Sequence, residues 1–74
     1  MNTLIDSVGI GKQKLFVELN DGSIITIPKN YTKRLEKADE KSLLNYRLIC
    51  NGIGIQFPDI NEDISLEGIL RDFK

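Results

Sequence analysis

The chain has 74 residues, enough for a single domain over residues 1–74, and its ten basic and eleven acidic side chains give a net charge of −1. This balance argues against a protein held to nucleic acid mainly by counterion release. With one cysteine and no histidine, the chain can form no internal disulfide and lacks the usual ligands of zinc and iron. We therefore expect no metal and no cofactor.

The first 28 residues predict three strands. Leu4–Ile10 is a candidate first strand, and Leu15–Pro28 has the alternation of a hairpin. A two-residue loop in this hairpin would mix polar and apolar side chains on both faces. A three-residue loop, Asn20–Gly22, with its glycine in the left-handed conformation, places Val17 opposite Ile25 and gathers the aliphatic side chains on one face.

Two short helices are predicted next. Asn30 is a suitable N-cap for a helix over Tyr31–Ala38, and Asp39 is one for a second helix over Glu40–Tyr46. The apolar residues expected to face the core are Tyr31, Leu35, Ala38, Leu43 and Leu44. The basic residues of these helices are expected to stay in water, and they form the candidate nucleic-acid-binding face: Lys33, Arg34, Lys37 and Lys41.

A second hairpin is predicted around Asn51 and Gly52, because both residues tolerate the positive φ angles of a two-residue type I′ turn. This register places Leu48 opposite Ile55. It also places Cys50 opposite Ile53 on the same apolar face, so the cysteine is predicted to be a small core residue. A role as a nucleophile is disfavoured because no histidine exists to activate the thiol.

The stretch "FPDINEDISLEGIL" combines an acidic cluster with a helix start. Asp59, Asn61 and Asp63 imitate the first ligands of a calcium loop, but isoleucine and leucine stand where that loop needs its glycine and its closing glutamate. Ser65 can instead cap a last helix, with Glu67 in its first turn near the positive end of the dipole. The helix would dock through an apolar stripe of Leu66, Ile69, Leu70 and Phe73.

These elements together predict a small α+β domain. It consists of two antiparallel β-hairpins plus an N-terminal strand, with two or three short helices packed on the sheet. No apolar run approaches the roughly 20 residues of a membrane span, and the first residues lack the layout of a secretion signal. We expect a cytoplasmic protein with no membrane association.

The run from Leu15 to Leu70 resembles the small bacterial proteins of the domain-of-unknown-function family numbered 2442. The most specific positions are Gly54, Ile55, Gln56, Phe57, Pro58, Asp59, Glu62, Asp63, Ser65, Glu67 and Gly68. The family often has His-Trp where Gln56 and Phe57 stand, and a proline near Lys33. The resemblance implies no catalytic activity. It implies a likeness to the antitoxin half of toxin-antitoxin pairs, often encoded beside a compact basic protein of ribonuclease-toxin type.

Three hypotheses of function follow. The first is a non-enzymatic, antitoxin-like interaction module that holds a small basic protein through acidic residues on and near a loop: Asp59, Glu62, Asp63 and Glu67. The alternative is a DNA-associated regulator that uses the basic helix face. A small hydrolase working through Asp59 and Asp63 is the third, although so short a chain has little surface for an enclosing cleft. Whether the chain forms a homo-oligomer is left open.

Overall fold

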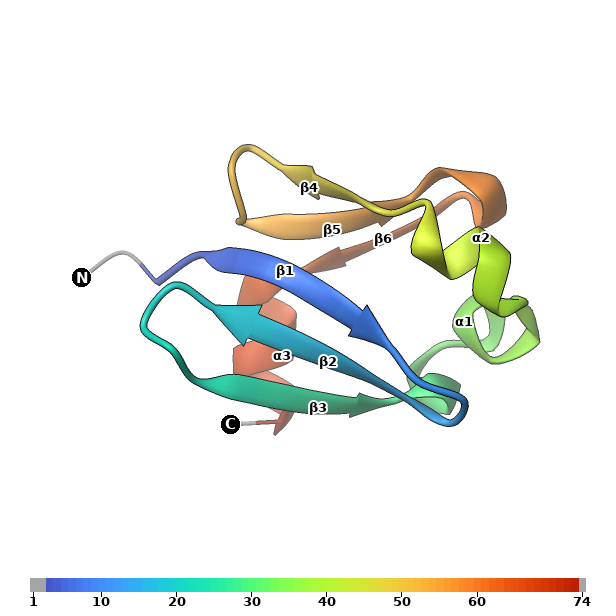
Figure 1. Ribbon diagram of the computed structural model, residues 1–74, viewed down its shortest axis with the longest axis horizontal. Coiled ribbons are helices and arrows are strands. Elements are labelled where there is room, and N and C mark those ends of the chain that lie inside the picture. Colours follow the sequence, from blue (N-terminus) through green and yellow to red (C-terminus); the bar gives the residue numbers. More distant parts are fainter. Residues whose placement is uncertain (1–2, 74) are drawn as a thin grey trace.

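The computed structural model, which describes residues 3–73, is an α+β domain of two three-stranded antiparallel sheets and short helices (Figure 1). The predicted fold class is confirmed. The strands are β1 (Ile5–Ile10), β2 (Lys14–Leu19), β3 (Ile24–Pro28), β4 (Arg47–Ile49), β5 (Gly54–Phe57) and β6 (Glu62–Ser65). The α-helices are α1 (Lys33–Lys37), α2 (Glu40–Leu44) and α3 (Leu66–Phe73), and two 3₁₀ turns are η1 (Lys29–Tyr31) and η2 (Pro58–Ile60).

The first sheet has the order β1-β2-β3, and its hairpin has the predicted register. Val17 pairs with Ile25 across a three-residue loop, and Gly22 has the expected positive φ of 89°. β1 pairs with β2 within the chain, with Val8 opposite Val17. Burial alternates along β2 and β3, so one face of this sheet points into the core and the other into solvent.

The second sheet has the order β4-β5-β6 and differs from the prediction at its turn. The pairing of Leu48 with Ile55 is confirmed, but the loop contains four residues, Cys50–Ile53. The Gly52 amide donates to the Ile49 carbonyl at 3.0 Å, so the tight turn has Cys50 at one of its central positions. The prediction that Cys50 lies in the core is therefore wrong, and the cysteine is exposed.

The physical reason is a contact between this loop and β1. The Ile5 amide donates to the Gly52 carbonyl at 2.9 Å, which joins the two sheets. A Cβ placed on Gly52 would lie 2.5 Å from the Ile5 carbonyl oxygen, and the φ of Gly52 is 122°. The loop thus has the length and the glycine that this close approach requires.

The helices begin at side-chain caps, of which two were predicted correctly. Asp39 accepts from the Ser42 amide at 2.8 Å, and Ser65 Oγ accepts from the Gly68 amide at 2.9 Å. The predicted cap Asn30 is wrong, because η1 occupies that segment and α1 begins after Thr32, whose hydroxyl accepts from the amide of Leu35 at 3.1 Å.

The core lies between the two sheets and α3, with α1 and α2 at one end of the molecule (Figure 1). Its buried residues are Ile5, Val8, Leu15, Val17, Leu19, Ile25, Ile27, Leu35, Ala38, Leu43, Ile55, Phe57, Ile64, Leu66 and Ile69.

Leu44 is 59% exposed, contrary to the prediction, because adjacent residues of the five-residue α2 point in different directions. The longest helix within residues 3–73 is α3, with eight residues. A helix of this length is too short to cross a bilayer.

We expect Gly52→Val to lower the free energy of unfolding by about 2 kcal/mol more than Gly22→Val. Both glycines have positive φ, but nothing lies within 4 Å of a Cβ placed on Gly22, whereas one on Gly52 meets the backbone of β1. Urea unfolding followed by circular dichroism measures the difference. Equal losses for the two variants would contradict the role of the Gly52 contact.

Candidate interaction surface

The acidic stretch predicted as a loop is a 3₁₀ turn followed by an edge strand. Asn61, in the left-handed conformation with φ 53°, turns the chain between η2 and β6. An Arg34 guanidinium nitrogen donates to the Asn61 carbonyl and anchors this corner to α1. Sequence reasoning missed β6, because its alternation is short and its residues are mostly acidic or polar.

The structure separates the four acids predicted to bind a partner. Asp59 lies in η2, where its carboxylate accepts from the Asn45 side-chain amide at 3.1 Å. Glu62 is half-buried, whereas Asp63 and Glu67 are exposed. Residues 3–73 contain no group of three or more acidic or cysteine side chains arranged to hold a metal ion.

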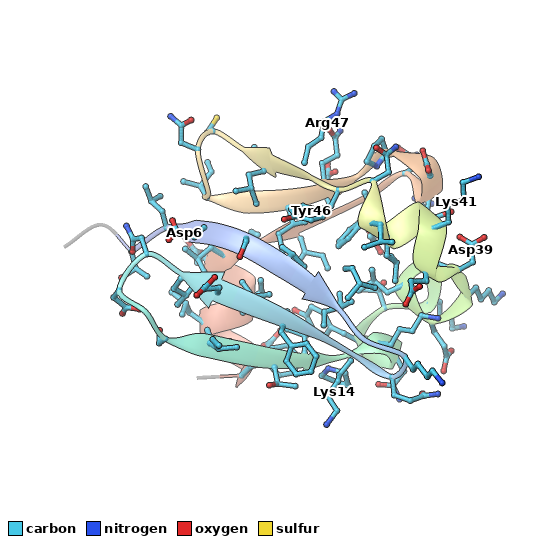
Figure 2. The ribbon with its side chains drawn as sticks, viewed as in Figure 1. Asp6, Lys14, Asp39, Lys41, Tyr46 and Arg47 are labelled. Atoms are coloured by element: carbon cyan, nitrogen blue, oxygen red, sulfur yellow. The ribbon has the colours of Figure 1, made fainter. Side chains whose placement is uncertain are left out.

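Asp63 belongs to the solvent-facing side of the second sheet. Because cross-strand partners share a face, one row there consists of Arg47, Gln56 and Asp63. Figure 2 shows Arg47 projecting away from the molecule, whereas Tyr46, one residue earlier, points between the sheets. The Val8 amide donates to the Tyr46 hydroxyl at 3.1 Å, which fixes this orientation. We call the side that carries Arg47 the outer face.

The next row of the outer face contains a glycine between two larger residues. Ile49, Gly54 and Ser65 lie in register across β4, β5 and β6. A Cβ on Gly54 would be 3.3 Å from Ile49 Cδ1 and 3.0 Å from the carbonyl oxygen of Ile64. The neighbouring atoms therefore close over Gly54, which is buried and has little room for a side chain.

Two adjoining hollows occupy this region and share Ile53 and Ser65. One, of about 550 Å³, is lined by Ile53, Ser65, Leu66, Glu67 and Leu70. The other, of about 320 Å³, is lined by Ile49, Ile53, Gly54, Asp63, Ile64 and Ser65. We call them together the Ile53 hollow.

The Ile53 hollow is mainly apolar and has acids at its edge. Ile53 at its centre is 52% exposed. Asp63 and Glu67 are the charged residues among those of residues 3–73 that line it, and no basic residue of this range does. The surface can accept an apolar side chain flanked by positive charge.

Sequence reasoning found Asp63 and Glu67 but missed the apolar part of the surface. Ile53 was placed opposite Cys50 on the core face, which the four-residue loop overturns. The available signal was the pair of glycines on either side of Ile53, because glycine at a strand end often marks a bulge or a close approach.

The four basic residues predicted for DNA binding lie at the end of the molecule formed by α1 and α2. All four are exposed, as predicted. Lys33, Arg34 and Lys37 are on α1 and Lys41 is on α2, so two five-residue helices carry them and no single continuous helix does. A separate hollow of about 280 Å³ is lined by Lys12, Gln13, Pro28, Lys29, Asn30 and Glu36.

α3, which carries Glu67 and Leu70, is held by a hydrogen bond from η1. The Tyr31 hydroxyl donates to Asp72 Oδ2 at 2.6 Å, and the Tyr31 ring packs edge-on against Phe73 at 4.8 Å between centroids. The hydrogen bond from Tyr31, with help from Arg71, lowers the pKa of Asp72 below its usual value. The same hydrogen bond raises the pKa of Tyr31.

Comparison with known proteins agrees on fold and family. The model of the family described as "Protein of unknown function (DUF2442)" matches residues 5–74. The structure is similar to the crystal structure of a protein of unknown function from Rhodospirillum rubrum ATCC 11170, with a TM-score of 0.83 and 19% sequence identity over 96% of this chain and 88% of the other. At this identity the likeness shows the fold alone. No curated protein matches the chain.

We expect Tyr31→Phe to raise the pKa of Asp72 toward its ordinary value, because the variant lacks the main donor to the carboxylate. A carboxyl whose pKa is depressed by folding stabilises the protein above its unfolded pKa, near 4, and loses that contribution as pH falls through the folded value. The variant should therefore lose less stability than the wild type between pH 5 and pH 2. Carbon-detected NMR titration and urea unfolding measure these two effects.

Tyr46→Phe is the matched control, because the Tyr46 hydroxyl accepts from a backbone amide and has no carboxylate partner among the hydrogen bonds described. It should leave the titration of Asp72 unchanged. An identical Asp72 pKa in the wild type and in Tyr31→Phe would contradict the assignment.

Proposed function

We propose that this chain, which belongs to the DUF2442 family, is a non-enzymatic interaction module that binds a basic protein through the Ile53 hollow. The observation that supports this most is an open apolar hollow whose charged lining residues, Asp63 and Glu67, are both acidic. Apolar contact supplies binding free energy, and the acids favour encounter with a positively charged partner.

The proposal extends to the class of partner. A small basic protein of toxin type, with this chain as its antitoxin-like counterpart, is the partner that the family resemblance suggests. The geometry supports a basic partner through the charge of the hollow, whereas the toxin class rests on the resemblance alone. The name of the matching family assigns no function.

A DNA-associated regulator is the alternative. Its support is the exposure of Lys33, Arg34, Lys37 and Lys41. Against it, acids lie among these bases on the same short helices, for example Glu36 and Glu40, and Arg34 already donates to the Asn61 carbonyl. DNA binding would slow the migration of random duplex DNA in a gel at low salt concentration, and this effect would disappear as the salt concentration rises.

We expect Ile53→Lys to abolish capture of the protein that co-purifies with a tagged chain, because it places a positive charge in the hollow that receives the partner. The fold should tolerate it, since Ile53 is already 52% exposed. Ile24→Lys is the matched control: Ile24 is 59% exposed on the solvent-facing side of the first sheet. Equal capture by both variants, or equal loss, would overturn the proposed site.

We expect the double variant Asp63→Asn and Glu67→Gln to lower the association rate for the same partner and to weaken its dependence on salt. Stability should change by no more than about 0.5 kcal/mol per site, because both carboxylates are exposed. Stopped-flow or surface-plasmon measurements at several salt concentrations give the rates.

The matched control is Asp59→Asn with Glu62→Gln, which removes the same charge from positions that do not line the hollow. If all four acids act together, as the sequence alone suggests, both double variants will slow association equally. If the hollow is the site, the Asp63 and Glu67 pair will have the larger effect.

A further inference from the structure

We propose that the partner binds as an added β-strand along the free edge of β6, with alternate side chains entering the Ile53 hollow. This inference rests on the interaction function proposed above and specifies its mode. β6 is the outer strand of the sheet order β4-β5-β6, and no other strand of residues 3–73 pairs with its second edge. An open strand edge is a template for main-chain pairing.

The register shows which backbone groups point to that edge. The Leu66 amide donates to the Ile53 carbonyl at 2.9 Å, and Ile64 lies opposite Ile55. Hydrogen-bonded and non-hydrogen-bonded pairs alternate along antiparallel strands. Ile64 therefore bonds to β5, whereas the amide and carbonyl groups of Asp63 and Ser65 face away from it.

The side chains at this edge are open enough for a partner to approach. Asp63 and Ser65 are both exposed. The Asp63 amide donates to Oε1 of the adjacent Glu62 at 3.3 Å, a long contact that a carbonyl of an added strand can replace. Ser65 Oγ is occupied by the cap of α3, and its carbonyl accepts the first hydrogen bond of that helix, which leaves the Ser65 amide for pairing.

An added strand would extend both rows of the outer face by one member. Next to the row that ends at Asp63, it would place a basic side chain beside the carboxylate. Two residues along, next to the row that ends at Ser65, it would place an apolar side chain at the Ile53 hollow. The segment recognised is therefore extended, with an apolar and a basic residue two positions apart, so that both lie on the same face of the added strand.

A second copy of this chain does not fit the edge. Two β6 strands side by side would bring Glu62 and Asp63 of both chains into one short ladder, and a register with Asp63 opposite Asp63 would put like charges directly across from each other, which is destabilising. The short length and acidic charge of β6 also discourage unspecific pairing. These features select a basic segment from a different chain.

The test is an NMR titration of the ¹⁵N-labelled protein with the capped peptide Thr-Ile-Thr-Lys-Thr, whose isoleucine and lysine lie on the same face of a strand. We expect shifts of the amides around the hollow, at Ile53, Asp63, Ser65 and Glu67, and slower hydrogen exchange at Asp63 and Ser65 by about tenfold at saturation. Thr-Gly-Thr-Lys-Thr should bind more weakly because it cannot fill the hollow. Thr-Ile-Thr-Glu-Thr should not bind, because its glutamate would lie beside Asp63.

Two variants at one position separate strand pairing from charge. Asp63→Ala and Asp63→Pro both remove the carboxylate, but the proline also removes the edge amide without removing a bond to β5. We expect the proline variant to bind Thr-Ile-Thr-Lys-Thr about fivefold more weakly than the alanine variant, the effect of one hydrogen bond. If the proline variant fails to fold, exchange at Asp63 and Ser65 in the wild type decides.

The possible outcomes distinguish the two proposals. Shifts at Ile53 and Glu67, with unchanged exchange at Asp63 and Ser65 and equal affinities of the alanine and proline variants, would overturn strand addition and leave the proposed function standing. Absence of any shift around the hollow, together with partner capture that survives Ile53→Lys, would overturn both.

Discussion

The close approach of Gly52 to Ile5 is the constraint on which the second sheet and its surface depend. Both three-stranded sheets contribute residues to one core, so the fold depends on how the two sheets are joined. The Ile5 amide reaches the Gly52 carbonyl only with a glycine at positive φ and a loop of four residues. That loop turns Cys50 and Ile53 outward, and Ile53 becomes the centre of the hollow. A contact that assembles the core thus also creates the exposed apolar surface.

Local chemistry explains which parts of the fold are predictable from sequence. The first hairpin follows from alternation and one left-handed glycine, and the caps at Asp39 and Ser65 involve partners three residues away. The second loop could not be derived in this way, because its length is set by Ile5, some 45 residues earlier. The cap of α1 was missed for a related reason: η1 directs Tyr31 toward Asp72 on α3, a distant partner.

The candidate site was only half visible in the sequence. Clustering of acids on both sides of a helix cap indicated Asp63 and Glu67, but it could not show that η2 and the turn at Asn61 place Asp59 next to Asn45. The apolar half looked like core, since Ile53 and Leu70 fit the same periodic patterns as buried residues. Periodicity identifies an apolar face, but the number of neighbours that cover it depends on tertiary structure.

The acids and the hollow have different energetic roles in the proposed recognition. Exposed ion pairs contribute at most about 1 kcal/mol each, so Asp63 and Glu67 cannot by themselves hold a partner tightly. Apolar contact with Ile53 and Leu70, together with main-chain pairing along β6, would supply affinity without discriminating between partners. Discrimination then comes from the carboxylates, which penalise an acidic segment or a second copy of the chain and favour a basic one. Affinity and specificity are thus assigned to adjacent but chemically different parts of one surface.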